Sequence, residues 1–151
     1  MKTILFAFVA ILLLFTACKD KYYYSEYQSI KNQSWLIKDT LTFSKTIEQP
    51  SNTPHQILLS VRHDKDFEFS NLWLQVDVSY NGKTASKKQE VVLYNKLGKP
   101  FGKCTGSICT QTIPIVNNIS FDKKGIVQIK ITQLMRKNPI ENIKDIGVII
   151  E

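Results

Sequence analysis

The three cysteines are the residues whose chemistry follows most directly from the sequence. Cys18 follows two small residues, Thr16 and Ala17, at the end of an apolar run over Ile4–Phe15. This run is shorter than the roughly 20 apolar residues of a membrane-spanning helix, but it fits the apolar part of a secretory signal. A thiol at this place resembles the bacterial lipobox, in which the cysteine takes a diacylglyceryl group and becomes the mature N-terminus. We therefore predict a lipoprotein signal peptide over residues 1–17 and lipidation of Cys18; the alternative is a plain cleaved signal followed by an unmodified cysteine.

Cys104 and Cys109 are separated by four residues, and both lie outside the cytoplasm if the chain is exported. Disulfides persist in oxidising compartments, and closing a loop this short stabilises a fold by about 2 kcal/mol. A Cys-x4-Cys metal or redox site is the alternative, but a zinc site needs two more ligands. The two histidines, His55 and His63, are distant in the sequence. We favour a disulfide and predict neither a metal nor a cofactor.

Acidic residues alternate between residues 63 and 68, where Asp64, Asp66 and Glu68 could offer carboxylate oxygens to a calcium ion. Lys65 lies among them, and the segment lacks the turn glycine of a strong calcium loop. We favour solvated loop charge. The sequence also has no Gly-x-Ser-x-Gly, no His-Glu-x-x-His and no phosphate-binding glycine loop. We therefore predict that the chain is not an enzyme.

Aromatic residues flank the same acidic segment and give a second possible binding site. Phe67, Phe69 and Trp73 could form a platform on which a sugar or a partner protein stacks, or they could be packed in the interior. Trp73 alternates with the apolar residues around it, so it faces away from them. We favour packing, because large aromatics are more often buried than displayed.

Arg136 offers a planar guanidinium that suits a carboxylate or phosphate. One arginine without a second basic partner makes a poor anion site. The interpretation that we favour is an ion pair that holds the turn beginning at Asn138-Pro139.

Removal of residues 1–17 leaves a chain of the usual size for one domain. The formal net charge of +7 is spread along the chain, and the longest basic runs are the pairs Lys87-Lys88 and Lys123-Lys124. A dispersed charge of this kind argues against nucleic-acid binding. The expected partners are the membrane, through acylated Cys18, and other envelope components, with acidic polysaccharide among the candidates.

Strand patterns dominate the rest of the chain. Leu72, Leu74, Val76 and Val78 alternate with polar residues, and Asn81-Gly82 follows them as a hairpin turn. We predict strands over 40–47, 56–62, 72–80, 91–94, 112–116, 125–134 and 146–150, with turns at 50–54, 96–100 and 122–125. Residues 18–34 show no sustained period and are predicted to be the lipidated N-terminus and a tether. The sequence thus predicts one all-β domain over residues 35–151, an antiparallel β-sandwich or jelly roll.

Several segments in this order and spacing together resemble the gliding-motility lipoprotein H (GldH) family of Bacteroidetes. The resemblance is carried by Ser70-Asn71-Leu72-Trp73-Leu74, Gly98, Gly102, Phe121, Lys123-Lys124-Gly125, Gln133-Leu134-Met135-Arg136-Lys137-Asn138-Pro139-Ile140, Asp145-Ile146-Gly147-Val148 and Ile150-Glu151. Family members usually have a glycine-rich loop without cysteine where this chain has Cys104 and Cys109.

The resemblance implies an envelope lipoprotein that is needed for gliding and linked to the machinery that moves and secretes adhesins, with no catalytic residues to carry over. We therefore expect a lipid-anchored accessory protein of the gliding apparatus, in the outer membrane, that acts through protein contacts. A carbohydrate-binding envelope lipoprotein is the alternative.

Overall fold

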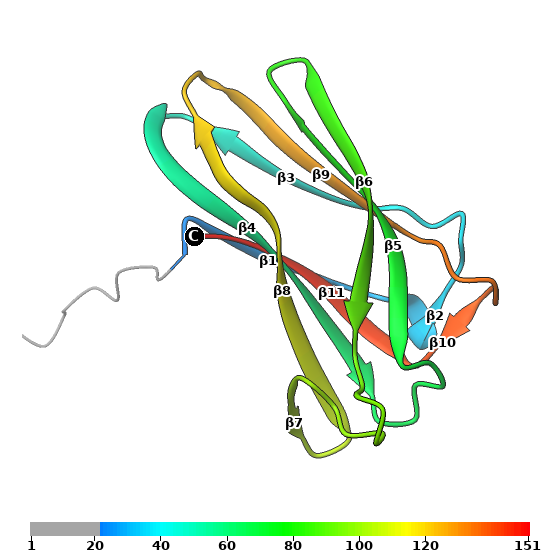
Figure 1. Ribbon diagram of the computed structural model, residues 1–151. Helices are drawn as coiled ribbons and strands as arrows, with labels where there is room; N and C mark the ends of the chain where they lie inside the picture. The colour runs from blue at the N-terminus through cyan, green and yellow to red at the C-terminus, as the bar shows by residue number, and fades with distance from the viewer. Residues whose placement is uncertain (1–21) are drawn as a thin grey trace, which may run out of the picture.

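The computed structural model describes residues 22–151, which form one all-β domain without an α-helix (Figure 1). Its elements are β1 (Tyr24–Ser29), the 3₁₀ turn η1 (Lys31–Gln33), β2 (Ser34–Trp35), β3 (Leu41–Ile47), β4 (Ser51–Asp64), β5 (Asn71–Tyr80), β6 (Lys83–Val92), β7 (Lys103–Thr105), β8 (Ile108–Phe121), β9 (Gly125–Gln133), β10 (Ile140–Glu141) and β11 (Ile143–Ile150). No helix within these residues has the length and apolar character needed to cross a bilayer.

The long strands form two antiparallel sheets with the order β1-β11-β4-β8-β7 and β3-β9-β5-β6, and β2 pairs with β10 beside them. If the short strands β2, β7 and β10 are left out, the remaining eight strands are ordered 1-8-3-6 in one sheet and 2-7-4-5 in the other. This is the strand order of a jelly roll. The predicted all-β antiparallel fold is confirmed.

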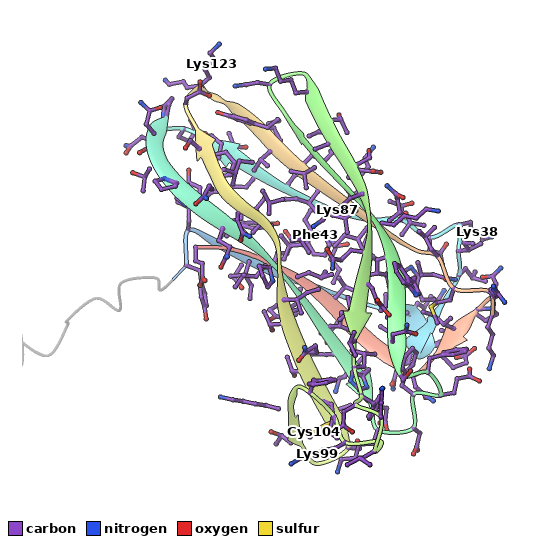
Figure 2. All side chains as sticks on the ribbon, viewed as in Figure 1. Lys38, Phe43, Lys87, Lys99, Cys104 and Lys123 are labelled. Carbon is purple, nitrogen blue, oxygen red and sulfur yellow. A yellow bond between two sulfur atoms is a disulfide. The ribbon has the colours of Figure 1, made fainter. Side chains whose placement is uncertain are left out.

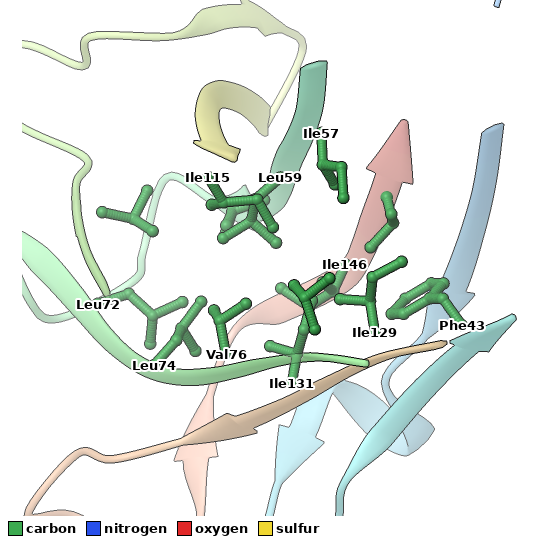
Figure 3. Packing of buried hydrophobic residues seen from close by; sticks show 14 of the residues in the cluster. Phe43, Ile57, Leu59, Leu72, Leu74, Val76, Ile115, Ile129, Ile131 and Ile146 are labelled. Carbon is green, nitrogen blue, oxygen red and sulfur yellow. The ribbon is translucent and has the colours of Figure 1, made fainter. Parts of the chain in front are cut away.

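The core is a single apolar layer between the two sheets (Figure 3). Because side chains alternate across a strand, the central strands supply every second residue to this layer. The buried residues include Leu72, Leu74 and Val76 from β5, Ile129 and Ile131 from β9, Ile57 and Leu59 from β4, and Ile146 and Val148 from β11. The strands predicted from these patterns are therefore the ones that carry the core.

The predicted hairpin after β5 is confirmed, but its second strand begins earlier than predicted. Asn81 and Gly82 have φ values of 50° and 72° and form a two-residue turn. β6 then pairs with the whole of β5, from Lys83 opposite Tyr80 to Val92 opposite Asn71. The apolar pattern predicts this strand only at 91–94, because residues 83–88 are exposed on both faces of an edge strand and all but Ala85 are polar.

Two other predicted boundaries are wrong. Part of the predicted tether is β1, which pairs with β11 from Tyr24 opposite Ile150 to Ser29 opposite Asp145. No apolar alternation marks β1, since its half-buried and exposed positions are nearly all polar or tyrosine. Likewise, the turn predicted at 50–54 lies largely within β4, whose pairing with β8 shifts register there. The signal peptide and Cys18 lie outside the described residues.

Tyr27 of β1 covers Gly147 of β11, the residue directly opposite it. A Cβ atom at Gly147 would lie 2.3 Å from Cε1 of the Tyr27 ring, so only glycine leaves room for the ring in this position. An aromatic ring that covers a cross-strand glycine is a recognised means of fixing strand pairing. The contact therefore joins the N-terminal strand to the C-terminal one.

We predict that Gly147→Ala lowers the free energy of unfolding by about 1 kcal/mol, because the Tyr27 ring must leave the strand surface. In a Tyr27→Ala background the same change should be close to neutral, since no ring then meets the added methyl group. Denaturant unfolding of the four variants in a double-mutant cycle measures the coupling. Equal costs in both backgrounds would show that the ring does not hold β1.

Candidate functional site

The acidic side chains of the 63–68 segment do not converge on one point. The Asp66 amide donates to Oδ1 of Asp64 at 3.2 Å, whereas Glu68 forms an ion pair with Lys137. Within residues 22–151 no group of three or more histidine, cysteine, aspartate or glutamate side chains is placed to hold a metal ion. The segment is the charged end of β4 and the loop after it, and the Asp64 and Glu68 carboxylates have different partners.

The three aromatic residues Phe67, Phe69 and Trp73 do not form one cluster, because Phe67 is buried and Trp73 is exposed on the surface. Phe67 is buried, and the ring of Phe69 meets it edge-on with centroids 5.7 Å apart. Packing is therefore the role of the Phe67 ring in the structure. Trp73 instead lies on the outer face of β5 and is 40% exposed. Its predicted burial is wrong, because no element in the described part of the chain covers that face of the β3-β9-β5-β6 sheet.

His63 is buried, whereas the sequence suggests for it only the role of a metal ligand distant from the cysteines. Its Nδ1 atom lies 2.9 Å from the carbonyl oxygen of Asp64, and its ring packs against Phe67 and Tyr94 with centroid distances of 5.9 and 5.4 Å. Burial lowers the pKa of His63, and the Asp64 carbonyl and carboxylate oppose this shift. The signal was present in the sequence, since His63 continues the inward alternation of β4.

A second buried ionisable group lies on the outer face of the β1-β11-β4-β8-β7 sheet. Oδ1 of Asp145 is 3.4 Å from Nε of Arg62, yet it accepts no hydrogen bond. This is a charge contact without hydrogen-bond geometry. Burial raises the pKa of Asp145, and the Arg62 charge opposes the shift. Arg62 also lies over the Tyr27 ring, 5.9 Å from its centroid.

Arg136 is exposed and forms no hydrogen bond or ion pair with any residue in the 22–151 range. The ion pair predicted for it is made instead by the next residue, Lys137, with Glu68. The turn is held by Asn138, whose Oδ1 atom accepts from the backbone amide of Ile37 at 2.8 Å. The structure thus leaves Arg136 as a single cation on the surface.

A group of exposed apolar residues lies in the connection from β6 to β7. Val92, Leu97 and Phe101 are 43%, 91% and 57% exposed, and we call them the β6–β7 patch. Asn95 shapes the loop, because its Oδ1 atom accepts from the amides of Leu97 and Lys99 at 2.9 and 3.0 Å. The sequence predicts only a turn at 96–100, although a leucine between lysine and glycine is a visible sign of exposed apolar surface there.

Cys104 and Cys109 are directly opposite each other in the hairpin of β7 and β8. Their sulfur atoms are bonded in the structure, at 2.00 Å, and the hairpin lies at the end of the molecule labelled by Lys99 and Cys104 in Figure 2. Gly106, with a φ of 62°, allows the tight turn between them. Formation of the bond in the cell envelope stays a prediction.

For the disulfide, mass spectrometry of the protein under non-reducing conditions should find one peptide pair joined at Cys104 and Cys109. Cys104→Ser should lower the free energy of unfolding by about 2 kcal/mol at most, because the closed loop is short. Cys104 is the suitable position, since it is exposed and Cys109 is buried. Two free thiols in protein taken directly from the envelope would contradict the prediction.

For His63, we predict that stability falls as the pH drops through about 6.5. The lowered pKa means that the folded state binds this proton less readily than the unfolded state, so its contribution is complete above the ordinary pKa of 6.5 and is lost below it. His63→Phe should remove this part of the pH dependence. Asp145 acts in the opposite direction, since its raised pKa favours the folded state on acidification.

Denaturant unfolding of wild type and His63→Phe between about pH 8 and about pH 5 checks the prediction. The difference between the two proteins isolates His63, because the Asp145 contribution is common to both. Parallel curves for the two proteins would contradict it.

Comparison with known proteins identifies the family. The model of the family described as GldH lipoprotein matches residues 22–150. A curated protein of Christiangramia forsetii, "Gliding motility lipoprotein GldH homolog", is 29% identical over 154 residues, which cover 97% of this chain and 93% of that protein. This is a family of motility lipoproteins and not of enzymes, and its members are held in the cell envelope by lipid. The family match extends over nearly all of the described jelly roll, and the chain therefore belongs to the GldH lipoprotein family.

Proposed function

We propose that this chain is an accessory protein of the bacterial gliding apparatus that acts by binding other proteins of the gliding or secretion machinery. Family membership and the name of the Christiangramia forsetii protein support the link to gliding. The anchor is the lipid on Cys18, and the membrane is the outer membrane. The domain then works as a docking subunit and turns over no substrate.

The observation that carries the docking function is the β6–β7 patch. Exposed apolar side chains scattered singly are normal, but a group of them at one place marks an interaction site. Val92, Leu97 and Phe101 are three of the eight large apolar side chains that are exposed in the described residues, and they lie within ten consecutive residues, from the end of β6 into the connection to β7. An exposed apolar surface of this kind suits a protein partner better than a small polar molecule.

Carbohydrate binding is a second candidate function, because the Trp73 ring is open to solvent. It lies on the outer face of the sheet, opposite Glu90 of β6, where an aromatic ring and a polar neighbour could stack and orient a sugar. The two functions differ in their response to Trp73→Ala. Loss of polysaccharide retention with gliding intact would favour the sugar site as a separate activity.

The docking function can be tested by complementing a strain that lacks the gene. Leu97→Ser combined with Phe101→Ser should abolish spreading on a surface, because the patch loses its apolar area while the core is untouched. Ile126→Ser is the matched control. Ile126 is 58% exposed but lies on β9, away from the patch, and this variant should glide like the wild type.

Two further variants in the same strain separate anchoring and loop chemistry from docking. Cys18→Ala should leave an unlipidated protein and no gliding. A strain with the triple variant Asp64→Asn, Asp66→Asn, Glu68→Gln should glide almost normally, because the docking function requires neither proton transfer nor metal binding by these side chains. A loop variant that is folded and anchored yet immotile would contradict the docking function.

A further inference from the structure

The two sheets leave a groove on the side where β6 and β8 face each other. One hollow of about 380 Å³ lies between Gln89 and Val92 of β6 and Ile113 and Pro114 of β8, with Phe101 at its end. A second, smaller hollow of about 80 Å³ lies further along the same two strands, between Ala85 and Lys87 of β6 and Ile115 and Val116 of β8. The groove therefore runs along both strands and ends at the β6–β7 patch.

β6 offers an unpaired backbone edge along this groove. It is the last strand of its sheet, and its pairing with β5 has no bulge over ten residues. Because the two-residue turn makes Lys83 and Tyr80 a hydrogen-bonded pair, alternate residues from Lys83 bond to β5. The amides and carbonyls of the residues between them, such as Ser86 and Lys88, point away from β5. In agreement with this, the carbonyl of Glu90 accepts a hydrogen bond at 2.8 Å from a side chain, that of Gln89.

β8 forms the other wall of the groove but is a poor edge for pairing. Its short partner β7 pairs only with residues 108–110, so the strand is open beyond that point. Pro114 lacks an amide hydrogen, and the register shifts near Val116 disturb its backbone. Ile113 and Val116 are partly buried and pack against the core. This wall contributes apolar surface, while β6 contributes hydrogen bonds.

The charges along the groove define what can occupy it. β6 carries Lys83, Lys87 and Lys88 against Glu90, which gives its ten residues a net charge of +2. The side chain of Asn71 also donates to Oε1 of Glu90, at 2.5 Å. The facing segment 111–116 of β8 has no charged residue. The rim is thus basic and the floor apolar.

A second copy of this chain fits this site badly. Pairing of two β6 edges would bring the lysines of one copy against those of the other, and like charges on neighbouring strands are destabilising. Lysines on an edge strand are a common means of preventing such self-association.

We propose that the groove binds an extended segment of a partner protein, in which apolar and acidic residues alternate, as an added strand on the free edge of β6. The main chain of the segment pairs with β6, and its apolar side chains cover Ile113 and Val116. Its carboxylates meet Lys88 on the outer face of β6, and the long, exposed side chain of Lys87 reaches them from the inner face. Strand addition lengthens the β3-β9-β5-β6 sheet by one strand and closes the open side of the jelly roll. This inference rests on the proposed docking function and specifies the residue pattern of the partner segment.

The test uses the full lipoprotein purified in a neutral detergent and a fluorescent ten-residue peptide of alternating valine and glutamate. Fluorescence anisotropy at low ionic strength should show binding. Lys87→Glu with Lys88→Glu should weaken it about tenfold, because two attractive contacts become repulsive. Lys123→Glu with Lys124→Glu is the matched control, since it makes the same change in net charge in the loop after β8, and it should bind within about twofold of the wild type.

Two further peptides check the mode of binding. A peptide of alternating valine and lysine should bind the Lys87→Glu, Lys88→Glu variant better than the wild type. A central proline in the valine and glutamate peptide should abolish binding, because it breaks the added strand.

The proposal is overturned if the acidic and basic peptides bind the wild type equally, if the proline peptide still binds, or if none binds. It is also overturned if sedimentation shows a dimer whose formation excludes the peptide, which would assign the groove to a second copy. None of these results changes the motility outcome of the patch variants, so failure of this inference and failure of the docking function are distinguishable.

Discussion

The contact between the inner faces of the two sheets is the constraint on which the rest of the structure depends. Each sheet buries only one face, so the fold requires that alternate residues of β4, β5, β9 and β11 be apolar and in register. A slip of one residue would turn all of these side chains to solvent. The strands that close the sheets, β6 above all, lie at the margin of this layer. They are free to carry polar residues, and the proposed docking surface lies there.

This division explains which elements could be predicted from the sequence. β5 and β9 show apolar residues at every second position because one face of each is buried, and the Asn81-Gly82 turn fixes the end of β5. β1 and most of β6 could not be found in this way, since an edge strand with two exposed or half-buried faces has no reason to alternate. β4 and β8 extend beyond their apolar parts because their ends pair across bulges, where hydrogen bonds and not burial define the strand.

The candidate site was harder to predict for a related reason. Alternation correctly placed Trp73 on the face opposite Leu72 and Leu74, but whether another layer covers that face depends on strands distant in the sequence. Phe67 belongs to a loop without a period, and its burial depends on the rings of His63 and Phe69 that pack against it. The β6–β7 patch and the groove involve two sheets at once, and no local pattern encodes such a juxtaposition.

The two ends of the described chain lie together at one end of the sheet, where Tyr24 is opposite Ile150. β11 then runs back to Ile143, which is opposite His63 beside the loops that carry the exposed apolar residues. At about 3.3 Å per residue the eight residues of β11 span about 26 Å. The length of β11 thus sets the distance between the two ends of the sheet. If the chain is anchored ahead of Tyr24, the proposed contact surface lies about 26 Å from the point where the chain enters the domain.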